Sequence, residues 1–489
     1  MSISFNQIPN GQLTPFVFVE FDNSHANQGP AIQNYRALVL GQRLASGTVA
    51  ADVPTRVTSE EQAAEYFGRG SMIHQQVQAF LANNRVTELW VIARDDLQAG
   101  VQATLDLTIT GTATQSGTFN LMIGGRRVRA GVTVGENSTA IATAVAAAIN
   151  ADGELAVTAT ASAAKVTLRA RHKGEAGNGI DVRCNYYTGE RFPEGVSAPR
   201  QARLSNGTGN PDISPAIAAM GDEAYHIIAM PYTDGANLTA LESELASRWG
   251  PERQLDGLAF AGAKGSHAEL GTLGDSRNSE HVSIGGFSGV PTLPWQCAAA
   301  QAAVVALHGQ IDPARPFQTL PMVGVLAPWP EDRFTRQERN LLLNDGISTF
   351  TVSPGGEVLV ERLVTTYNLN AQGAPDPSYR DVNTLLTLSY LRFDFRTYIT
   401  NKYPRHKLAG DSVQVPSGQA IMTPSLGKAE AIAKFMQWQN LGLVEELDQF
   451  KRDLVVERDP QDPNRLNWLL PPDLINQLRI NAAQIQFRV

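Results

Sequence analysis

The stretch HVSIGGFSGVPTLPWQCAAAQAAVVALH, residues 281–308, holds one strand, one loop and one helix in series. Its first six residues have the length of a strand and carry no acidic or lysine side chain, and its last fourteen are an alanine-rich run of helix length. Similar pairs of runs lie on both sides. We expect strands at 224–229, 257–262, 281–286, 322–326 and 347–352, with helices at about 238–248, 267–274 and 295–308. Strands alternating with helices predict an α/β fold with a mainly parallel sheet covered on both faces.

The same rhythm occupies residues 35–98, where strands are expected at 35–40 and 88–93 around two helices. Ser59 fits the N-cap of the first helix, because two glutamates follow it in the first turn. Residues 357–366 fit a hairpin partner for the strand at 347–353. A loop rich in Asn, Gly and Pro at 368–377 then marks a boundary. Beyond it we expect helices at 382–400 and 426–440, while 443–453 fits either a helix or a strand.

Residues 100–200 differ in composition from both flanks, being rich in Thr, Ala, Gly and Val. Alternation of apolar and polar residues at 103–110 is typical of a half-buried strand. The expected organisation is an α/β core with an inserted β-rich module, which we expect to be dispensable for assembly, and an α+β C-terminal domain. The bounds are 1–30 for an N-terminal arm, 31–99 and 201–366 for the core, 100–200 for the insert, 367–477 for the C-terminal domain and 478–489 for a C-terminal arm.

Composition excludes several classes of protein. The chain has 489 residues, a formal net charge of -8 and 18% charged residues, so it lacks the clustered basic charge of a nucleic-acid coat. Its two cysteines, Cys184 and Cys297, are too few for a disulfide scaffold. No apolar run reaches the ~20 residues of a membrane span, and the first residues lack a secretory pattern. We therefore expect a globular protein that is made in a cytoplasm and does not insert into membranes.

Motifs for enzyme chemistry are incomplete. The sequence GFSGV at 286–290 is close to the G-x-S-x-G motif around a catalytic serine, but Val290 replaces the last glycine. No glycine-rich segment has the spacing of a phosphate or dinucleotide loop. The eight histidines show no zinc-ligand spacing. We therefore predict no catalytic residue, no cofactor and no metal ligand, and expect Ser288 to belong to a turn after a strand.

Amphipathic strands are expected near both ends of the chain. Near the start, Phe16 and Phe18 share one face, and Val17, Val19 and Phe21 share the other. At the end, Ile485, Phe487 and Val489 share a face of a strand that also includes Ile480. These strands either complete sheets within their own chain, as in most proteins, or add to a sheet of a neighbouring subunit. The polar tether at 22–30 and the terminal positions favour addition, which would build an extended mesh.

Five segments carry a resemblance to a known family. They are LNDGIST at 343–349, GGEVLVERLVTT at 355–366, YRDVN at 379–383, LRF at 391–393 and PPDLINQLR at 471–479. In this order and spacing, the chain resembles the tail sheath proteins of Mu-like contractile phages over most of its length.

The resemblance implies a structural subunit of the virion that is not an enzyme. Hexameric rings would stack into a helical sleeve around an inner tail tube protein, with baseplate and tail terminator proteins at the ends. Contraction would drive the tube through the host envelope without direct contact to nucleic acid. Residues 367–489 would face the tube, with Lys428, Glu430 and Lys434 as candidate contacts. Both terminal arms would lend strands to adjacent subunits.

Three alternatives remain open on the sequence. The sheath could belong to a phage-derived bacteriocin or a secretion device, since this sequence does not separate either of them from a phage sheath. An α/β core also suits a hydrolase, which would need a nucleophile and a base that the motifs lack. Finally, the insert at 100–200 could bind a receptor on a cell surface.

Overall fold

The computed structural model describes residues 33–413 and 418–488, so the predicted N-terminal strand at 16–21 lies outside the described residues. The described chain forms two compact units. The larger contains residues 34–390, 442–445 and 473–488, and the smaller contains residue 33 and residues 391–413, 418–441 and 446–472. No helix within the described ranges has both the length and the apolar character needed to cross a lipid bilayer.

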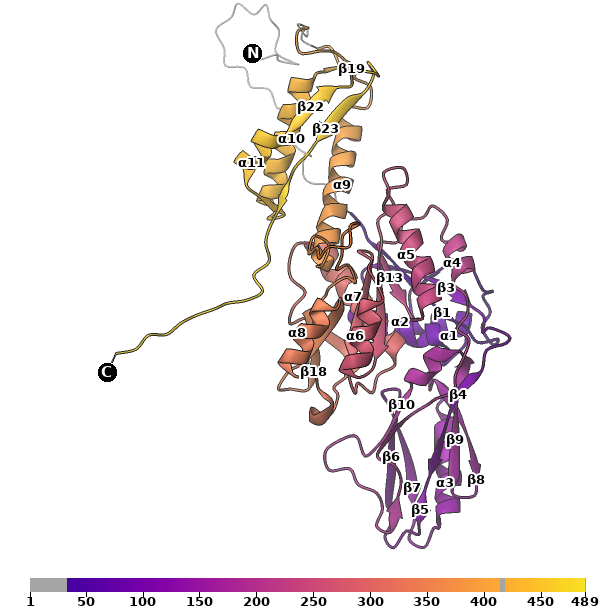
Figure 1. The fold of residues 1–489 in the computed structure, drawn as a ribbon. Helices are drawn as coiled ribbons and strands as arrows, with labels where there is room; N and C mark the ends of the chain where they lie inside the picture. The colour runs from indigo at the N-terminus through magenta and orange to yellow at the C-terminus, as the bar shows by residue number, and fades with distance from the viewer. Residues whose placement is uncertain (1–32, 414–417, 489) are drawn as a thin grey trace, which may run out of the picture. The chain divides into compact units, whose positions relative to one another are not determined.

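A mixed sheet lies at the centre of the larger unit (Figure 1). Within the described residues it has nine strands in the order β16-β18-β17-β15-β14-β13-β1-β3-β2. Neighbours from β17 to β3 pair in parallel, whereas β2, β18 and β16 pair antiparallel. The bounds are β1 Arg36–Gln42, β2 Thr55–Val57, β3 Glu88–Arg94, β13 Ile227–Met230, β14 Leu258–Lys264, β15 Val282–Phe287, β16 Pro321–Leu326, β17 Ile347–Val352 and β18 Glu357–Arg362.

Helices cover both faces of this sheet, because successive strand residues point to opposite sides. In β1, Val39 packs into one apolar cluster and Leu38 into another. The first cluster includes α1 (Glu60–Phe67), α2 (Met72–Asn83) and α7 (Pro294–Ile311). The second includes α4 (Ser214–Ala219), α5 (Gly235–Trp249) and α6 (His267–Asp275). The sheet is therefore apolar on both faces, which explains why β13 and β15 are buried along their whole length.

Two expectations for the core require correction. The strand expected at 322–326 forms, as β16, but it pairs antiparallel with β18 at the sheet edge and does not continue the parallel series. The short strand β2 was not expected, because three residues are too few to show the alternation of apolar and polar side chains that identifies a strand. The hairpin expected for 347–353 and 357–366 is confirmed by the pairing of β17 with β18.

The segment 100–200 forms a β-rich module whose apolar core is continuous with that of the central sheet. Together with β12, which lies just after residue 200, its strands form a four-stranded sheet, β12-β10-β6-β7, a three-stranded sheet, β4-β9-β8, and a short pair, β11-β5, beside one helix, α3. The bounds are β4 Gln102–Thr108, β5 Thr110–Gly111, β6 Gly117–Ile123, β7 Arg126–Val132, α3 Ser138–Ala151, β8 Val157–Ser162, β9 Lys165–Lys173, η1 Glu175–Gly179, β10 Asp181–Cys184, β11 Val196–Ser197 and β12 Gln201–Arg203.

Polar contacts also fasten this module to the core. The Arg183 side chain is fully buried and its Nη1 lies 3.2 Å from Oδ2 of Asp332. The Tyr186 hydroxyl donates to the carbonyl of Ala327 at 2.7 Å. Removal of the module would expose a large apolar surface, so the expectation that assembly tolerates its deletion is not supported by this packing.

The smaller unit consists of most of α9 (Val382–Lys402), α10 (Pro424–Asn440), α11 (Leu447–Asp453), the pair β19 (Lys407–Leu408) with β20 (Ile421–Met422), and the hairpin of β22 (Val455–Arg458) with β23 (Leu466–Leu469). The ambiguous segment 443–453 contains both kinds of element. Its first residues form the short strand β21 (Val444–Glu445), which belongs to the larger unit, and the rest form α11.

A histidine beside β1 and β13 should make the stability of the core depend on pH. Nδ1 of His226 accepts a hydrogen bond from the backbone N–H of Arg36 at 3.1 Å. Burial, with a smaller effect of the Arg36 charge, lowers the pKa of His226 to about 4. Unfolded histidine has a pKa of about 6.5, so between these values the unfolded state binds more protons than the folded state. Stability therefore falls as the pH drops from about 6.5 to 4.

We expect this one residue to remove about 2 kcal/mol of unfolding free energy between pH 7 and pH 4.5. Urea unfolding of the wild type and of His226→Gln at both pH values would measure it, because the glutamine can accept the same hydrogen bond without titrating. An identical pH dependence in the two proteins would contradict the assignment.

Candidate assembly interface

The chain is fastened to the larger unit just before its C-terminal end. Strand β24 (Asp473–Leu474) pairs antiparallel with β21. The backbone N–H of Ile475 then donates to the carbonyl of Leu443 at 3.1 Å. Nε2 of Gln477 donates to the carbonyl of Ala314 at 2.8 Å. These contacts fix the chain as far as Arg479, whose guanidinium forms an ion pair with Asp381 at 2.9 Å.

Residues 480–488 form no helix or strand in the structure. Figure 1 shows this segment as an extended chain. Its apolar side chains are almost fully exposed, at 82% for Ile480, 88% for Ile485 and 83% for Phe487. The strand predicted for 478–489 is therefore not formed by the described part of the chain, because an extended segment needs a partner for its backbone N–H and C=O groups. Val489 lies outside the described residues.

The hairpin of β22 and β23 is a two-stranded sheet whose outer edges are open to a further strand. On its inner face, Trp468 lies over Gly427 of α10 and its ring centroid is 5.4 Å from that of Phe395. On its outer face, Val455 and Leu469 lie opposite each other and are 44% and 60% exposed. Neither strand pairs with any other strand among the described residues. Two-stranded sheets are marginally stable in water, and further strands would stabilise this one.

The edge strand of the large sheet, by contrast, is closed by side chains. Nδ2 of Asn83 donates to the carbonyl of Val323 in β16 at 2.9 Å, and Oδ1 of Asn83 accepts from the N–H of Val323 at 2.8 Å. Oγ1 of Thr292 accepts from the N–H of Leu326 at 2.9 Å. These bonds occupy the backbone groups that an added strand would need, so β16 is protected against edge-to-edge pairing.

The three residues predicted to face a tube differ in their surroundings. Lys428 is exposed on α10. Glu430 is half-buried, and its carboxylate accepts from Nζ of Lys402 at 2.7 Å and from the Tyr398 hydroxyl. Burial alone would raise the pKa of Glu430, but hydrogen bonds from Lys402 and neighbouring tyrosines outweigh it and lower this pKa. Lys434 is 2% exposed, with Nζ 2.6 Å from Oδ2 of Asp394. Of the three, only Lys428 is free to meet a partner directly.

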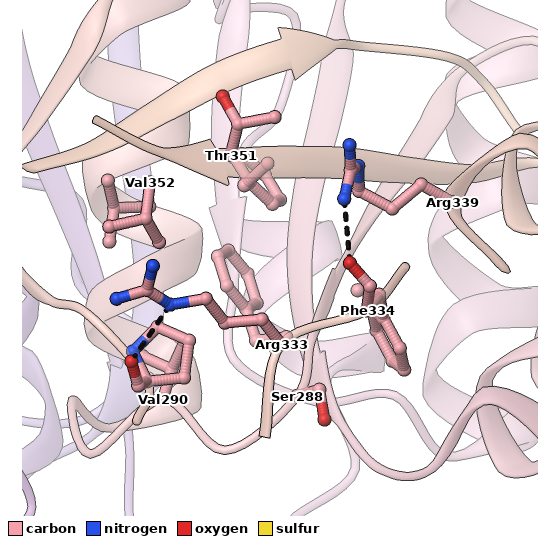
Figure 2. Close-up of a pocket in the computed structure, with 12 residues that line it drawn as sticks. Ser288, Val290, Arg333, Phe334, Arg339, Thr351 and Val352 are labelled. Atoms are coloured by element: carbon pink, nitrogen blue, oxygen red, sulfur yellow. Dashed lines mark hydrogen bonds between the residues drawn. The ribbon is translucent and has the colours of Figure 1, made fainter. Parts of the chain in front are cut away.

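Ser288, from the incomplete serine motif, lines a pocket of about 310 Å³ at the end of β15 (Figure 2). The floor includes the rings of Phe287 and Phe350, stacked with centroids 4.4 Å apart. The polar side chains that line it are Arg333, Arg339, Thr351 and Ser288 itself. No lining residue is a histidine or a carboxylate, so this pocket offers Ser288 no general base. In the described ranges, no group of His, Cys, Asp and Glu has the arrangement of a metal site.

Comparisons with known proteins show which family the chain belongs to. The profile of the phage tail sheath protein central domain matches residues 206–366, and that of the phage tail sheath C-terminal domain matches residues 374–488. The chain is 45% identical over 487 residues to the Mu-like prophage FluMu tail sheath protein of Haemophilus influenzae, covering 100% of both chains. The solved structure of a sheath tail protein from Listeria innocua has a similar fold, with a TM-score of 0.50, 15% identity and coverage of 93% of this chain and 95% of that one.

Proposed function

Because this chain belongs to the family of Mu-like phage tail sheath proteins, we propose that its copies polymerise into a contractile sleeve by exchanging terminal strands. The family is a structural one. The exchanged part of the C-terminal arm is residues 480–489, and its acceptor is the β22-β23 hairpin of a neighbouring copy. The observation that carries the proposal is the match between the two: an extended apolar segment without a partner, and a two-stranded sheet with open edges and an exposed apolar pair.

The chemistry of the two segments is complementary. In a strand, Ile485 and Phe487 project from the same face, and the outer face of the hairpin presents Val455 and Leu469. Complete burial of a large apolar side chain contributes about 1.5–3 kcal/mol, and the added backbone hydrogen bonds supply directionality. Ordering each arm residue costs about 1–2 kcal/mol, so one arm alone binds weakly. Assembly therefore depends on several contacts made by each subunit at once.

Strand exchange also suits a sleeve that changes length. Backbone hydrogen bonds in the exchanged sheet would hold neighbours together while contacts between the larger units repack. The sleeve would surround an inner tail tube and end at baseplate and terminator proteins, in rings of six subunits. Lys428 remains the candidate for a charged contact with the tube, since Glu430 and Lys434 are engaged within their own unit. Contraction would drive the tube through the host envelope. A bacteriocin sheath would use the same geometry.

Substitution of Leu469 by glutamate should block assembly without unfolding the monomer. A carboxylate at this 60% exposed position costs little in the free chain, but in the extended sheet it would lie beside the apolar side chains of the added arm and lose part of its hydration without a partner. We expect a monodisperse monomer with an unchanged Tm, and no hollow striated cylinders in negative-stain electron micrographs.

Val86→Glu serves as the matched control, because Val86 is 78% exposed and belongs to the larger unit, whereas the hairpin belongs to the smaller one. It should assemble as the wild type does. Cylinders of normal length from Leu469→Glu would show that the hairpin is not the acceptor.

A further inference from the structure

We propose that Asp381 positions the C-terminal arm by clamping its root, so that the exchanged segment begins at Ile480 and has a defined register. This inference rests on the proposed strand exchange and adds the residue that controls it. Neither the resemblance nor the sequence pattern assigns a role to Asp381.

The clamp is a carboxylate shared by two arginines. Nη2 of Arg479 lies 2.9 Å from Oδ1 of Asp381. Arg362, at the end of β18, donates from Nε to Oδ1 at 3.0 Å and from Nη2 to Oδ2 at 2.9 Å. Such bidentate pairing is geometrically specific, so Arg362 holds the carboxylate in one orientation. The backbone of Asp381 is also fixed, through an isolated bridge to Val364.

Charge makes Asp381 the necessary member of this group. The side chains of Arg479 and Asp381 are 15% and 23% exposed, so water screens the cluster incompletely. Burial lowers the pKa of Arg479, the Asp381 carboxylate raises it, and the nearby charge of Arg362 lowers it again. Two like charges therefore lie close together, and the shared carboxylate compensates their repulsion. Without its negative charge, Arg479 would be expelled from the site.

Neighbouring bonds determine the direction in which the chain leaves the clamp. Nε2 of Gln318 donates to the carbonyl of Leu478 at 3.4 Å, beside the bond from Gln477 to Ala314. The loop that donates the first of these bonds and accepts the second is itself held, because Nδ2 of Asn383 donates to the carbonyls of Pro313 and Arg315 at 2.8 and 2.9 Å. The root of the arm is therefore a rigid point, and the free segment starts one residue after Arg479.

A fixed root matters because strand register is sensitive to single residues. A slip by one residue would move Ile485 and Phe487 to the opposite face of the acceptor sheet. An extended segment from Ile480 to Arg488 spans roughly 30 Å, at about 3.3 Å for each residue. Release of residues 475–479 would lengthen this reach and allow several registers. The clamp thus selects both the neighbour and the register.

The test uses Asp381→Asn in the full chain, which keeps the shape of the side chain and removes its charge. Trypsin cleaves after Arg479 only when this residue leaves the clamp, so we expect release of the terminal peptide, identified by mass, to be roughly tenfold faster than in the wild type. Hydrogen exchange of residues 473–479 should accelerate in parallel. The control is Glu361→Gln. Glu361 lies next to Arg362 in β18 and forms a comparable ion pair with Arg339 at 2.8 Å, so its loss should leave both measurements as in the wild type.

A second variant, Arg479→Gln, tests the clamp if Asp381→Asn fails to fold, because it removes only the arginine of the arm. Its hydrogen exchange at residues 473–479 should also accelerate. Both variants should yield few or irregular cylinders. Unchanged exchange at 473–479 in both would overturn the clamp, and normal cylinders from a released root would overturn its positioning role. Failure of the wild type to form cylinders would refute the proposed strand exchange but not the clamp, because hydrogen exchange at residues 473–479 is measured on the monomer.

Discussion

The chain lacking residues 482–489 should fold as a stable monomer and form no sleeves. The described residues it loses belong to a segment without helix or strand, and Ile485 and Phe487 are 88% and 83% exposed. Truncation of such a segment changes the unfolding free energy by no more than about 0.5 kcal/mol. The same truncation removes the apolar pair that we propose enters the neighbouring hairpin. Light scattering and negative-stain microscopy would measure the loss of assembly, and an unchanged Tm would show that folding is intact.

A control for this truncation keeps the length of the arm. Ile485→Ser combined with Phe487→Ser removes the apolar contacts but leaves the backbone, and should also prevent assembly. Gln484→Ala combined with Gln486→Ala retains the apolar face and should still polymerise. Sleeves of normal length from the truncated chain would refute the role of the C-terminal arm.

Arg183→Met should strongly destabilise the folded chain, because it breaks a buried ion pair. Nε of Arg183 lies 2.8 Å from Oδ1 of Asp181, which is 2% exposed, and its guanidinium lies 4.3 Å from the centre of the Trp329 ring. Methionine fills most of the volume but leaves the Asp181 charge buried, with Gln201 as a remaining hydrogen-bond donor at 3.2 Å. Removal of one partner of a buried ion pair costs about 3–5 kcal/mol.

The matched control lies on the same tryptophan. The guanidinium of Arg200 lies 4.1 Å from the Trp329 ring, but its side chain is 64% exposed and its ion pair with Glu331 is 3.8 Å long. Arg200→Met should therefore cost about 1 kcal/mol or less. Urea unfolding of both variants would measure the difference. Equal destabilisation would contradict the large cost expected for breaking the buried ion pair of Arg183 with Asp181.

Several parts of the fold follow from local pattern. Apolar runs of strand length separated by amphipathic or alanine-rich runs were sufficient to predict β13, β14 and β15 and the helices between them, because burial on both faces requires continuous apolar residues. The turn at Gly355 and Gly356 was sufficient to predict that β18 pairs with β17. Such features depend on residues close together in the chain.

The candidate interface was only partly predictable. The alternation of apolar and polar residues at the end of the chain identified Ile485 and Phe487, because such a pattern depends only on neighbouring residues. Asp381 and Asn83 were not identified, because an isolated polar residue has no period and its partner lies far away in the chain. Lys434 was predicted at a surface, yet Asp394 holds it inside the smaller unit. A lysine on a helix shows its charge in the sequence but not the direction in which its side chain points.

The sequence by itself determined most of the strands and helices of the core, the family that the chain resembles, and the alternation of apolar residues in its C-terminal segment. Hydrophobic period and turn chemistry are local, because they depend only on residues close together in the chain. Only the tertiary structure decided that β16 is closed by Asn83, that the β-rich module shares the apolar core of the sheet, and that the arm is rooted at Asp381. These are contacts between residues tens to hundreds of positions apart, and only chain folding brings their charges and hydrogen-bonding groups within reach of each other.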